Sequence, residues 1–207
     1  MKGFAGTAGV QTHKLTSLLS CSKVSGRLID ASVAATTRQL RTPAPDGSTT
    51  LSVESLSLST ALRSDGARWK QYRTHSCFKR LRFVGDSLKD GAIERLLFPV
   101  NISNMHWAVF EINSVQTELL YGDSLDWAPP IDDTNTTNRW PQHHNSPELQ
   151  TASILPHGLQ SDSYSCAIAA LNTIRHAVFG DQGEFEDVYQ GGLKLSIGKF
   201  GDIWIRW

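Results

Sequence analysis

Two apolar runs joined by a four-residue, mainly polar connection constrain the fold of this 207-residue chain more than any other feature. The run HWAVFEI (106–112) is apolar on both faces, as a strand inside a sheet is. The second run, TELLYGD (117–123), follows directly after the polar connection of residues 113–116. Two strands at this spacing are typical of an antiparallel hairpin, so we expect a sheet built around them.

The pairing register of this hairpin predicts a histidine opposite a carboxylate. With the turn centred between Ser114 and Val115, paired residue numbers add up to 229, and His106 faces Asp123. The Cβ atoms of such a pair lie about 4.5–5.5 Å apart. A carboxylate at that position accepts a hydrogen bond from the imidazole, fixes its tautomer and stabilises its protonated form.

The rest of the chain places helices before the hairpin and one helix after it, which favours the α+β class. The expected elements are a helix at 27–40, a helix in preference to a strand at 51–63, strands at 94–100 and 152–158, and a largely buried helix from Cys166 to Gly180. Residues 124–151 contain four prolines and are interpreted as a long surface loop. Residues 1–25, rich in Gly, Ser and Thr, are interpreted as a poorly ordered leader before one domain at 26–207.

The composition argues against several classes of partner. Hydrophobic residues make up 40% of the chain and charged residues 19%, and the formal net charge is zero. A neutral chain without an apolar run of about 18 residues predicts neither a nucleic-acid nor a membrane partner. Its three cysteines are widely spaced, odd in number and without a CxxC motif, which indicates reduced thiols. We therefore expect an intracellular protein of the nucleus or cytoplasm.

The tetrapeptide GDSL occurs twice, at residues 85–88 and 122–125. The first copy looks like the nucleophile block of a GDSL esterase, with Ser87 as nucleophile. None of the seven histidines follows an aspartate by three residues, and there is no GxND for an oxyanion asparagine. The first copy is therefore interpreted as a structural turn, and the esterase as a weaker alternative.

The candidate nucleophile is Cys166, at the start of the last expected helix. Asp162, Ser163 and Ser165 precede it, and any of the three could cap that helix. A helix N-terminus and a neighbouring imidazolium both stabilise a thiolate. Gln160, six residues earlier, can direct a side-chain N–H toward a developing oxyanion beside the backbone N–H of Cys166.

A metal centre is the remaining alternative from the residues alone. His143, His144 and His157 lie in or near the proline-rich segment, but they lack the spacing and the partners of a ligand set. We therefore expect neither a metal nor another cofactor.

The motifs, taken in chain order, resemble the ubiquitin-like-modifier protease family, which includes the SUMO proteases and is related to adenovirus-type proteases. They are the apolar-Pro-Val-Asn stretch and His-Trp of IERLLFPVNISNMHWAVFEI, the Asp-Ser-Leu of LLYGDSL, and the Gln-x-Asp-x-x-x-Cys of LQSDSYSC. The resemblance covers about residues 27–180 and is strongest over 94–172. It implies a papain-like, adenain-like cysteine protease architecture, with a mixed central sheet flanked by helices, and makes 26–207 the catalytic domain.

The resemblance also implies roles in catalysis. It makes Cys166 the nucleophile, His106 the general base and acid, and Asp123 the residue that orients the histidine. It makes Gln160 the oxyanion donor. The implied reaction is cleavage after the C-terminal Gly-Gly of a ubiquitin-like modifier, by a monomeric thiol protease that acts on the modifier and its conjugates.

Two residues are implied on the substrate side. Trp107 would line the narrow channel for the Gly-Gly tail, and Asp30, in RLIDASV, would contact the modifier. The family usually has Trp where Arg27 stands and Gly where Ala167 stands. The position of Arg27 suggests an alternative, a catalytically impaired relative that only binds a modifier.

Overall fold

The computed structural model describes residues 24–40, 50–64, 66–180, 194–197 and 203–206. Its helices are α2 (Gly26–Leu40), α3 (Leu56–Leu62), α4 (Gly66–Trp69), α5 (Lys79–Lys89), α6 (Ile131–Arg139) and α7 (Cys166–Phe179), with 3-10 helices η2 (Ser76–Phe78) and η3 (Trp140–His144). Its strands are β1 (Leu51–Val53), β2 (Arg95–Ile102), β3 (His106–Asn113), β4 (Glu118–Gly122), β5 (Gln150–Ile154), β6 (Lys194–Ile197) and β7 (Ile203–Arg206). The expected leader at 1–25 lies almost wholly outside the described residues.

The centre of the fold is a five-stranded mixed sheet in the order β1-β2-β3-β4-β5. The outer pairs β1–β2 and β4–β5 are parallel, while β2–β3 and β3–β4 are antiparallel. Strands β6 and β7 form a separate antiparallel pair. The predicted α+β class is confirmed, with the strands predicted at 94–100, 106–112 and 117–123 at the middle of the sheet. The strand predicted at 152–158 begins and ends earlier, as β5 at the edge.

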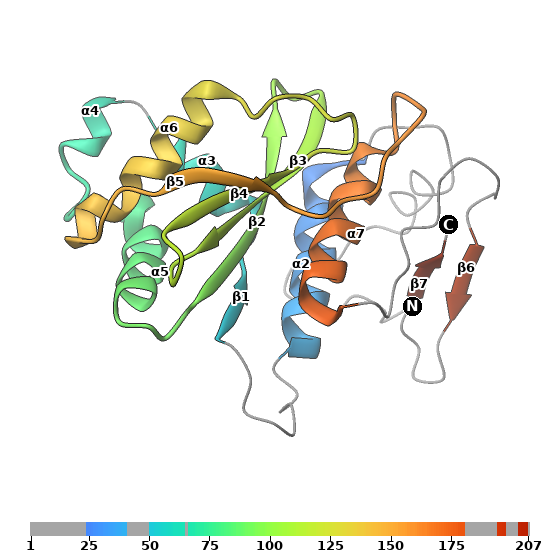
Figure 1. Cartoon of the computed structure of the whole chain (residues 1–207), viewed down its shortest axis with the longest axis horizontal. Coiled ribbons are helices and arrows are strands. Elements are labelled where there is room, and N and C mark those ends of the chain that lie inside the picture. Colours follow the sequence, from blue (N-terminus) through green and yellow to red (C-terminus); the bar gives the residue numbers. More distant parts are fainter. Residues whose placement is uncertain (1–23, 41–49, 65, 181–193, 198–202, 207) are drawn as a thin grey trace.

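Helices cover both faces of this sheet, which explains why the central strands are apolar throughout. Helices α2 and α7 lie side by side (Figure 1) and share one core with the β3 residues Trp107 and Val109. Helices α3 and α5 share the other core with the alternate β3 residues Ala108, Phe110 and Ile112. Because successive side chains of a strand point to opposite faces, β3 fills both cores. No helix in the described part of the chain is long and apolar enough to cross a membrane.

The β3–β4 hairpin has the predicted topology but a different register. Asn113 pairs with Glu118, so paired numbers add up to 231 and the predicted sum of 229 is wrong by two. The connection is Ser114–Thr117, and Thr117 has the positive φ of 58° that lets this longer turn close. A shift of two residues keeps every side chain on its predicted face, because the side-chain period of a strand is two.

Two other segments differ from the sequence prediction. The helix favoured at 51–63 is a short strand, β1, followed by α3, and β1 pairs with β2 at the edge of the sheet. The loop expected at 124–151 contains α6 and η3, and Trp140 of η3 is among the most buried side chains of the second core. Pro130 and Pro141 lie at the starts of α6 and η3, where a missing N–H is tolerated.

The first GDSL copy is not a turn but lies inside α5. Helix α5 packs against η3, where the indole N–H of Trp140 donates to the hydroxyl oxygen of Tyr72 at 2.9 Å. The Tyr72 hydroxyl lies 2.6 Å from Nε2 of buried His144, whose Nδ1 lies 2.7 Å from Oδ1 of Asp86. Burial lowers the pKa of His144, so the neutral ring accepts from Tyr72 and donates to Asp86. The aspartate of this GDSL thus anchors a buried polar chain.

Gly85 lies where α5 approaches this histidine most closely. A Cβ at that position would overlap the His144 ring. Two hydrogen bonds hold the ring in place, so it has no simple way to move aside. The glycine and the aspartate of the first copy therefore both serve the packing of α5 on η3.

We expect Gly85→Ala to destabilise the fold, although alanine is the better helix former by about 1 kcal/mol. The added methyl group overlaps the fixed His144 ring, and overpacking of this kind costs about 1–3 kcal/mol. The measurement is the free energy of unfolding from urea denaturation. Ser87→Ala, at a partly exposed position in the same helix, is the matched control and should change it by less than about 0.5 kcal/mol. Equal stability of Gly85→Ala and the unmodified chain would contradict this packing account.

Candidate active site

Three elements bring the predicted nucleophile, base and carboxylate together. His106 is the first residue of β3, Asp123 follows the last residue of β4, and Cys166 is the first residue of α7. Helix α7 packs on β3 across the first core. All three side chains are buried, with exposed fractions of 2–4%.

The predicted pair of His106 and Asp123 is present. Nε2 of His106 lies 2.7 Å from Oδ1 of Asp123. The β3–β4 ladder ends at the pair Val109–Gly122, so the two side chains meet diagonally on one face and not directly opposite each other. The register shift therefore changes the geometry of the contact but not the identity of the partners.

The Asp123 carboxylate has two further donors. The Tyr121 hydroxyl donates to Oδ2 at 2.7 Å, and the backbone N–H of Leu125 donates to Oδ1 at 2.8 Å. Burial by itself raises the pKa of Asp123, but the hydrogen bonds from His106, Leu125 and Tyr121 outweigh burial and lower it. Asp123 is thus a fixed anion that accepts at both oxygens.

The electrostatics of His106 follow from this anion. Burial lowers the pKa of His106, but hydrogen bonds to Asp123 and to Cys166, with the charges of both groups, together raise it to about 9. Since Nε2 faces Asp123, the other ring nitrogen, Nδ1, is the one left for Cys166. At neutral pH the ring is a cation between the carboxylate and the sulfur.

The segment before α7 is ordered by Asp162. Its Oδ1 accepts from the backbone N–H groups of Tyr164 and Ser165 and from the Ser165 hydroxyl, at 2.6–2.9 Å. Ser165 is the N-cap residue of α7 but makes no side-chain capping bond. Of the three residues predicted as caps, Asp162 makes its hydrogen bonds before the helix begins. It orders the loop that leads to Cys166. As the first residue of α7, Cys166 has an N–H without an acceptor inside the helix.

Gln160 is held in this loop by bonds at both ends of its amide. Its Oε1 accepts from the Ser124 hydroxyl at 2.6 Å, and its Nε2 donates to the carbonyl oxygen of Asp162 at 2.8 Å. The side chain is 9% exposed. An amide nitrogen carries two protons, so one N–H remains for another acceptor.

Comparisons with known proteins agree with this arrangement at the level of the fold. No protein-family model and no curated protein matches the sequence. Among solved structures, the SUMO protease Ulp1 with its catalytic cysteine oxidised to a sulfinic acid matches with a TM-score of 0.58 and 15% identity, over 86% of this chain and 80% of Ulp1. The C-terminal Ulp1 protease domain in complex with Smt3, the yeast ortholog of SUMO, matches with a TM-score of 0.52 and 17% identity, over 85% of this chain and 80% of that domain.

A third similar structure is the effector XopD of Xanthomonas campestris bound to ubiquitin. It matches with a TM-score of 0.53 and 17% identity, over 91% of this chain and 90% of XopD. This chain has the SUMO-type protease fold.

The residues expected on the substrate side lie at one end of this SUMO-type protease fold. Trp107 is 5% exposed and packs in the first core, with its ring near Gly26. Asp30 accepts from the backbone N–H of Leu56 at 2.9 Å, which ties α2 to the start of α3. Arg27 is exposed on the first turn of α2. The predicted contacts of Trp107 and Asp30 with a modifier stay predictions.

Two side chains that contact the candidate catalytic residues escaped the sequence analysis. Tyr121 binds the second oxygen of Asp123, and its position two residues earlier on the same strand face was the available signal. The Trp127 ring contacts the His106 ring in a tilted arrangement, with ring centroids 4.9 Å apart, and Trp127 is 55% exposed. The loop before Trp127 contains a turn in which the backbone N–H of Asp126 donates to the backbone carbonyl of Asp123. No periodic pattern marks Trp127 in the sequence.

The histidines considered as metal ligands have other roles in the fold. His143 stacks on Trp69, and His144 and His157 each lie within hydrogen-bond distance of an aspartate. Within the described ranges, no cluster of three or more His, Cys, Asp or Glu side chains could hold a metal ion.

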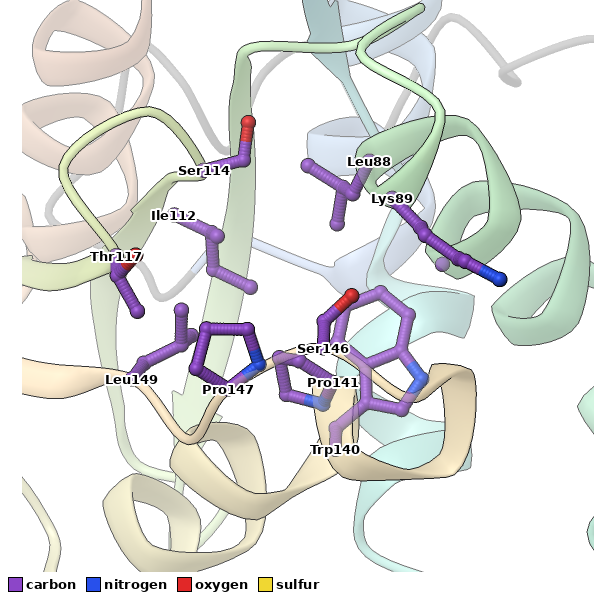
Figure 2. A pocket seen from close by; sticks show the side chains of 11 residues that line it. Leu88, Lys89, Ile112, Ser114, Thr117, Trp140, Pro141, Ser146, Pro147 and Leu149 are labelled. Atoms are coloured by element: carbon purple, nitrogen blue, oxygen red, sulfur yellow. The ribbon is translucent and has the colours of Figure 1, made fainter.

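A cavity of about 310 Å³ lies at the opposite end of the sheet from His106. Figure 2 shows Leu88 and Lys89 of α5 facing Ile112 and Thr117 of the hairpin across it, with Trp140 and its neighbours as the third wall. Ile112 is six residues along β3 from His106, or roughly 20 Å. This cavity is therefore separate from the candidate active site.

We expect an NMR titration of the His106 ring to show a midpoint near pH 9 in the unmodified chain. Both Asp123→Asn and Cys166→Ala should lower that midpoint, because each removes a partner that favours the imidazolium. Since the folded-state pKa lies above the ordinary 6.5, His106 stabilises the fold fully below pH 6.5, and this contribution is lost as the pH rises through 9. A midpoint at or below 6.5 in the unmodified chain would contradict this charge arrangement.

Proposed function

We propose that this chain is a cysteine protease that cleaves after the C-terminal Gly-Gly of a ubiquitin-like modifier. The observation that carries the proposal is the buried row of Cys166, His106 and Asp123, in which one imidazole bonds both a thiol and a fixed carboxylate. The same order of nucleophile, base and orienting group activates cysteine and serine nucleophiles on unrelated folds. The SUMO-type protease fold supports the same reading.

The first half of the reaction uses the charge that the site already stabilises. The sulfur of Cys166 attacks the carbonyl carbon after the last glycine of the tail, while its proton resides on His106. As the C–N bond breaks, His106 returns a proton to the leaving amine, and a thioester remains on Cys166. Asp123 keeps the ring oriented throughout and stays ionised.

The second half releases the modifier. Water loses a proton to His106 and attacks the thioester carbonyl, the C–S bond breaks, and the modifier leaves with a free carboxylate. Both halves pass through a tetrahedral oxyanion. The N–H of Cys166 and the free N–H of Gln160 are the donors proposed to stabilise it, a contribution of about 10²–10³ in rate for one donor.

The substrate side of the proposal rests on the aromatic residues around His106. Trp107 is next to the base in sequence and largely buried, which supports an entrance that admits only small residues such as glycine. Exposed Trp127, whose ring lies against that of His106, offers an apolar surface to the tail. The complexes of an Ulp1 domain with Smt3 and of XopD with ubiquitin support a folded modifier as substrate. A monomeric enzyme of the nucleus or cytoplasm remains part of the proposal.

The esterase alternative requires Ser87, which occupies a different environment. Its hydroxyl donates to the carbonyl oxygen of Phe83 inside α5 at 2.9 Å. The buried His144 beside this helix already has Asp86 and Tyr72 as partners of its two ring nitrogens. Among the described residues, this histidine is therefore not available as the free base that a serine nucleophile needs.

On one modifier substrate, we expect Cys166→Ala to abolish turnover and Ser87→Ala to leave it unchanged. His106→Ala should be nearly as severe as loss of the nucleophile, because it removes the base that bonds the thiol. Asp123→Asn should be less severe, since the base survives with a poorer orientation. The measurement is kcat/KM for release of a C-terminal fusion from a panel of ubiquitin-like modifiers. Full activity of Cys166→Ala, or loss of activity in Ser87→Ala, would overturn the proposed mechanism.

A further inference from the structure

The serine of the second GDSL copy is linked to Gln160 twice. The Ser124 hydroxyl donates to Oε1 of the Gln160 side chain at 2.6 Å, and the Gln160 backbone N–H donates to the Ser124 carbonyl at 2.8 Å. Both residues are buried, with exposed fractions of 4% and 9%. The loop that carries Gln160 is thereby fastened to the end of β4.

The chemistry of the partners fixes which way the amide points. The backbone carbonyl of Asp162 can only accept, so the group facing it must be the Gln160 Nε2. Oε1 is then the atom that faces Ser124, and the serine hydroxyl must be the donor. With one Nε2 proton used by Asp162, the direction of the second proton is set by the Ser124 bond.

Ser124 is also the direct neighbour of Asp123. His106, Tyr121 and the backbone N–H of Leu125 all bond the carboxylate of Asp123. These bonds hold Asp123 in place, and with it the backbone of the next residue, Ser124. One dipeptide therefore orients the base through its first side chain and the amide of Gln160 through its second. Loss of the Ser124 hydroxyl would leave the buried Oε1 of Gln160 without its donor, which carries a free-energy cost.

We propose that Ser124 is a positioning residue that holds the Gln160 amide with its free N–H directed at the reacting carbonyl oxygen. The proposal rests on the proposed function for its catalytic consequence, but the orientation itself does not. Ser87, the serine of the first copy, offers the contrast, because its hydroxyl bonds only its own helix. Identical tetrapeptides thus place one serine in a structural helix and the other behind the oxyanion donor.

A double-mutant cycle tests the catalytic part. Ser124→Ala should lower kcat about 10-fold with little change in KM, which is less than the roughly 10²–10³-fold loss from removing the Gln160 donor altogether. In the Gln160→Ala background the same change should cost no further kcat, because the group that Ser124 positions is gone. Ser87→Ala is the matched control and should leave kcat unchanged. Equal losses from Ser124→Ala in both backgrounds would overturn the proposal.

The orientation is measured separately by NMR of the glutamine side-chain amides, without turnover and without a Ser124 variant. In the unmodified chain, the Gln160 amide, assigned by its absence in Gln160→Ala, should give two proton signals that are shifted away from those of free glutamine and that exchange slowly with water. Signals at the positions of free glutamine, with fast exchange with water, would overturn the proposal. If the shifted signals are found but no modifier is cleaved, the proposed function fails while the held orientation of the Gln160 amide stands.

Discussion

The hydrogen bond between His106 and Asp123, 2.7 Å long and buried, is the contact on which the rest of the site depends. It joins the start of β3 to the end of β4, so it forms only when the hairpin pairs on the correct faces. It supplies the negative charge that keeps His106 protonated beside Cys166. Burying such a pair is costly unless every lone pair is satisfied, and Tyr121 and the Leu125 N–H complete the carboxylate. The sheet, the loop after β4 and α7 are therefore all constrained by one ion pair.

The two GDSL copies show how far chemistry depends on the element that holds a motif. In α5, Gly85 gives room to the His144 ring and Asp86 anchors it. At the end of β4, Gly122 lies close to the backbone of Leu155, and the following aspartate and serine bond to His106 and Gln160. In both places the glycine lets another segment approach closely, and the aspartate bonds a histidine. In the second copy, the histidine also bonds the thiol of Cys166.

Much of this arrangement was predictable from the sequence because it depends on local periodicity and chain order. The apolar runs predicted the central strands, and the order of His106, Asp123, Gln160 and Cys166 predicted the site. The hairpin register was missed by two because the turn closes through a positive φ at Thr117, which a polar connection does not reveal. The helices within 124–151 were missed because prolines at helix ends look like loop prolines. Trp127 and Ser124 make contacts between segments that are distant in the sequence, for which a single sequence carries no periodic signal.

The most direct test of the account is covalent capture by a panel of ubiquitin-like modifiers that carry an electrophile in place of the C-terminal glycine carboxylate. The account predicts a stable adduct with at least one modifier, mapped by mass spectrometry to Cys166 and blocked by prior alkylation of that thiol. Absence of any adduct across the panel, or an adduct mapped to another residue such as exposed Cys77, would contradict it.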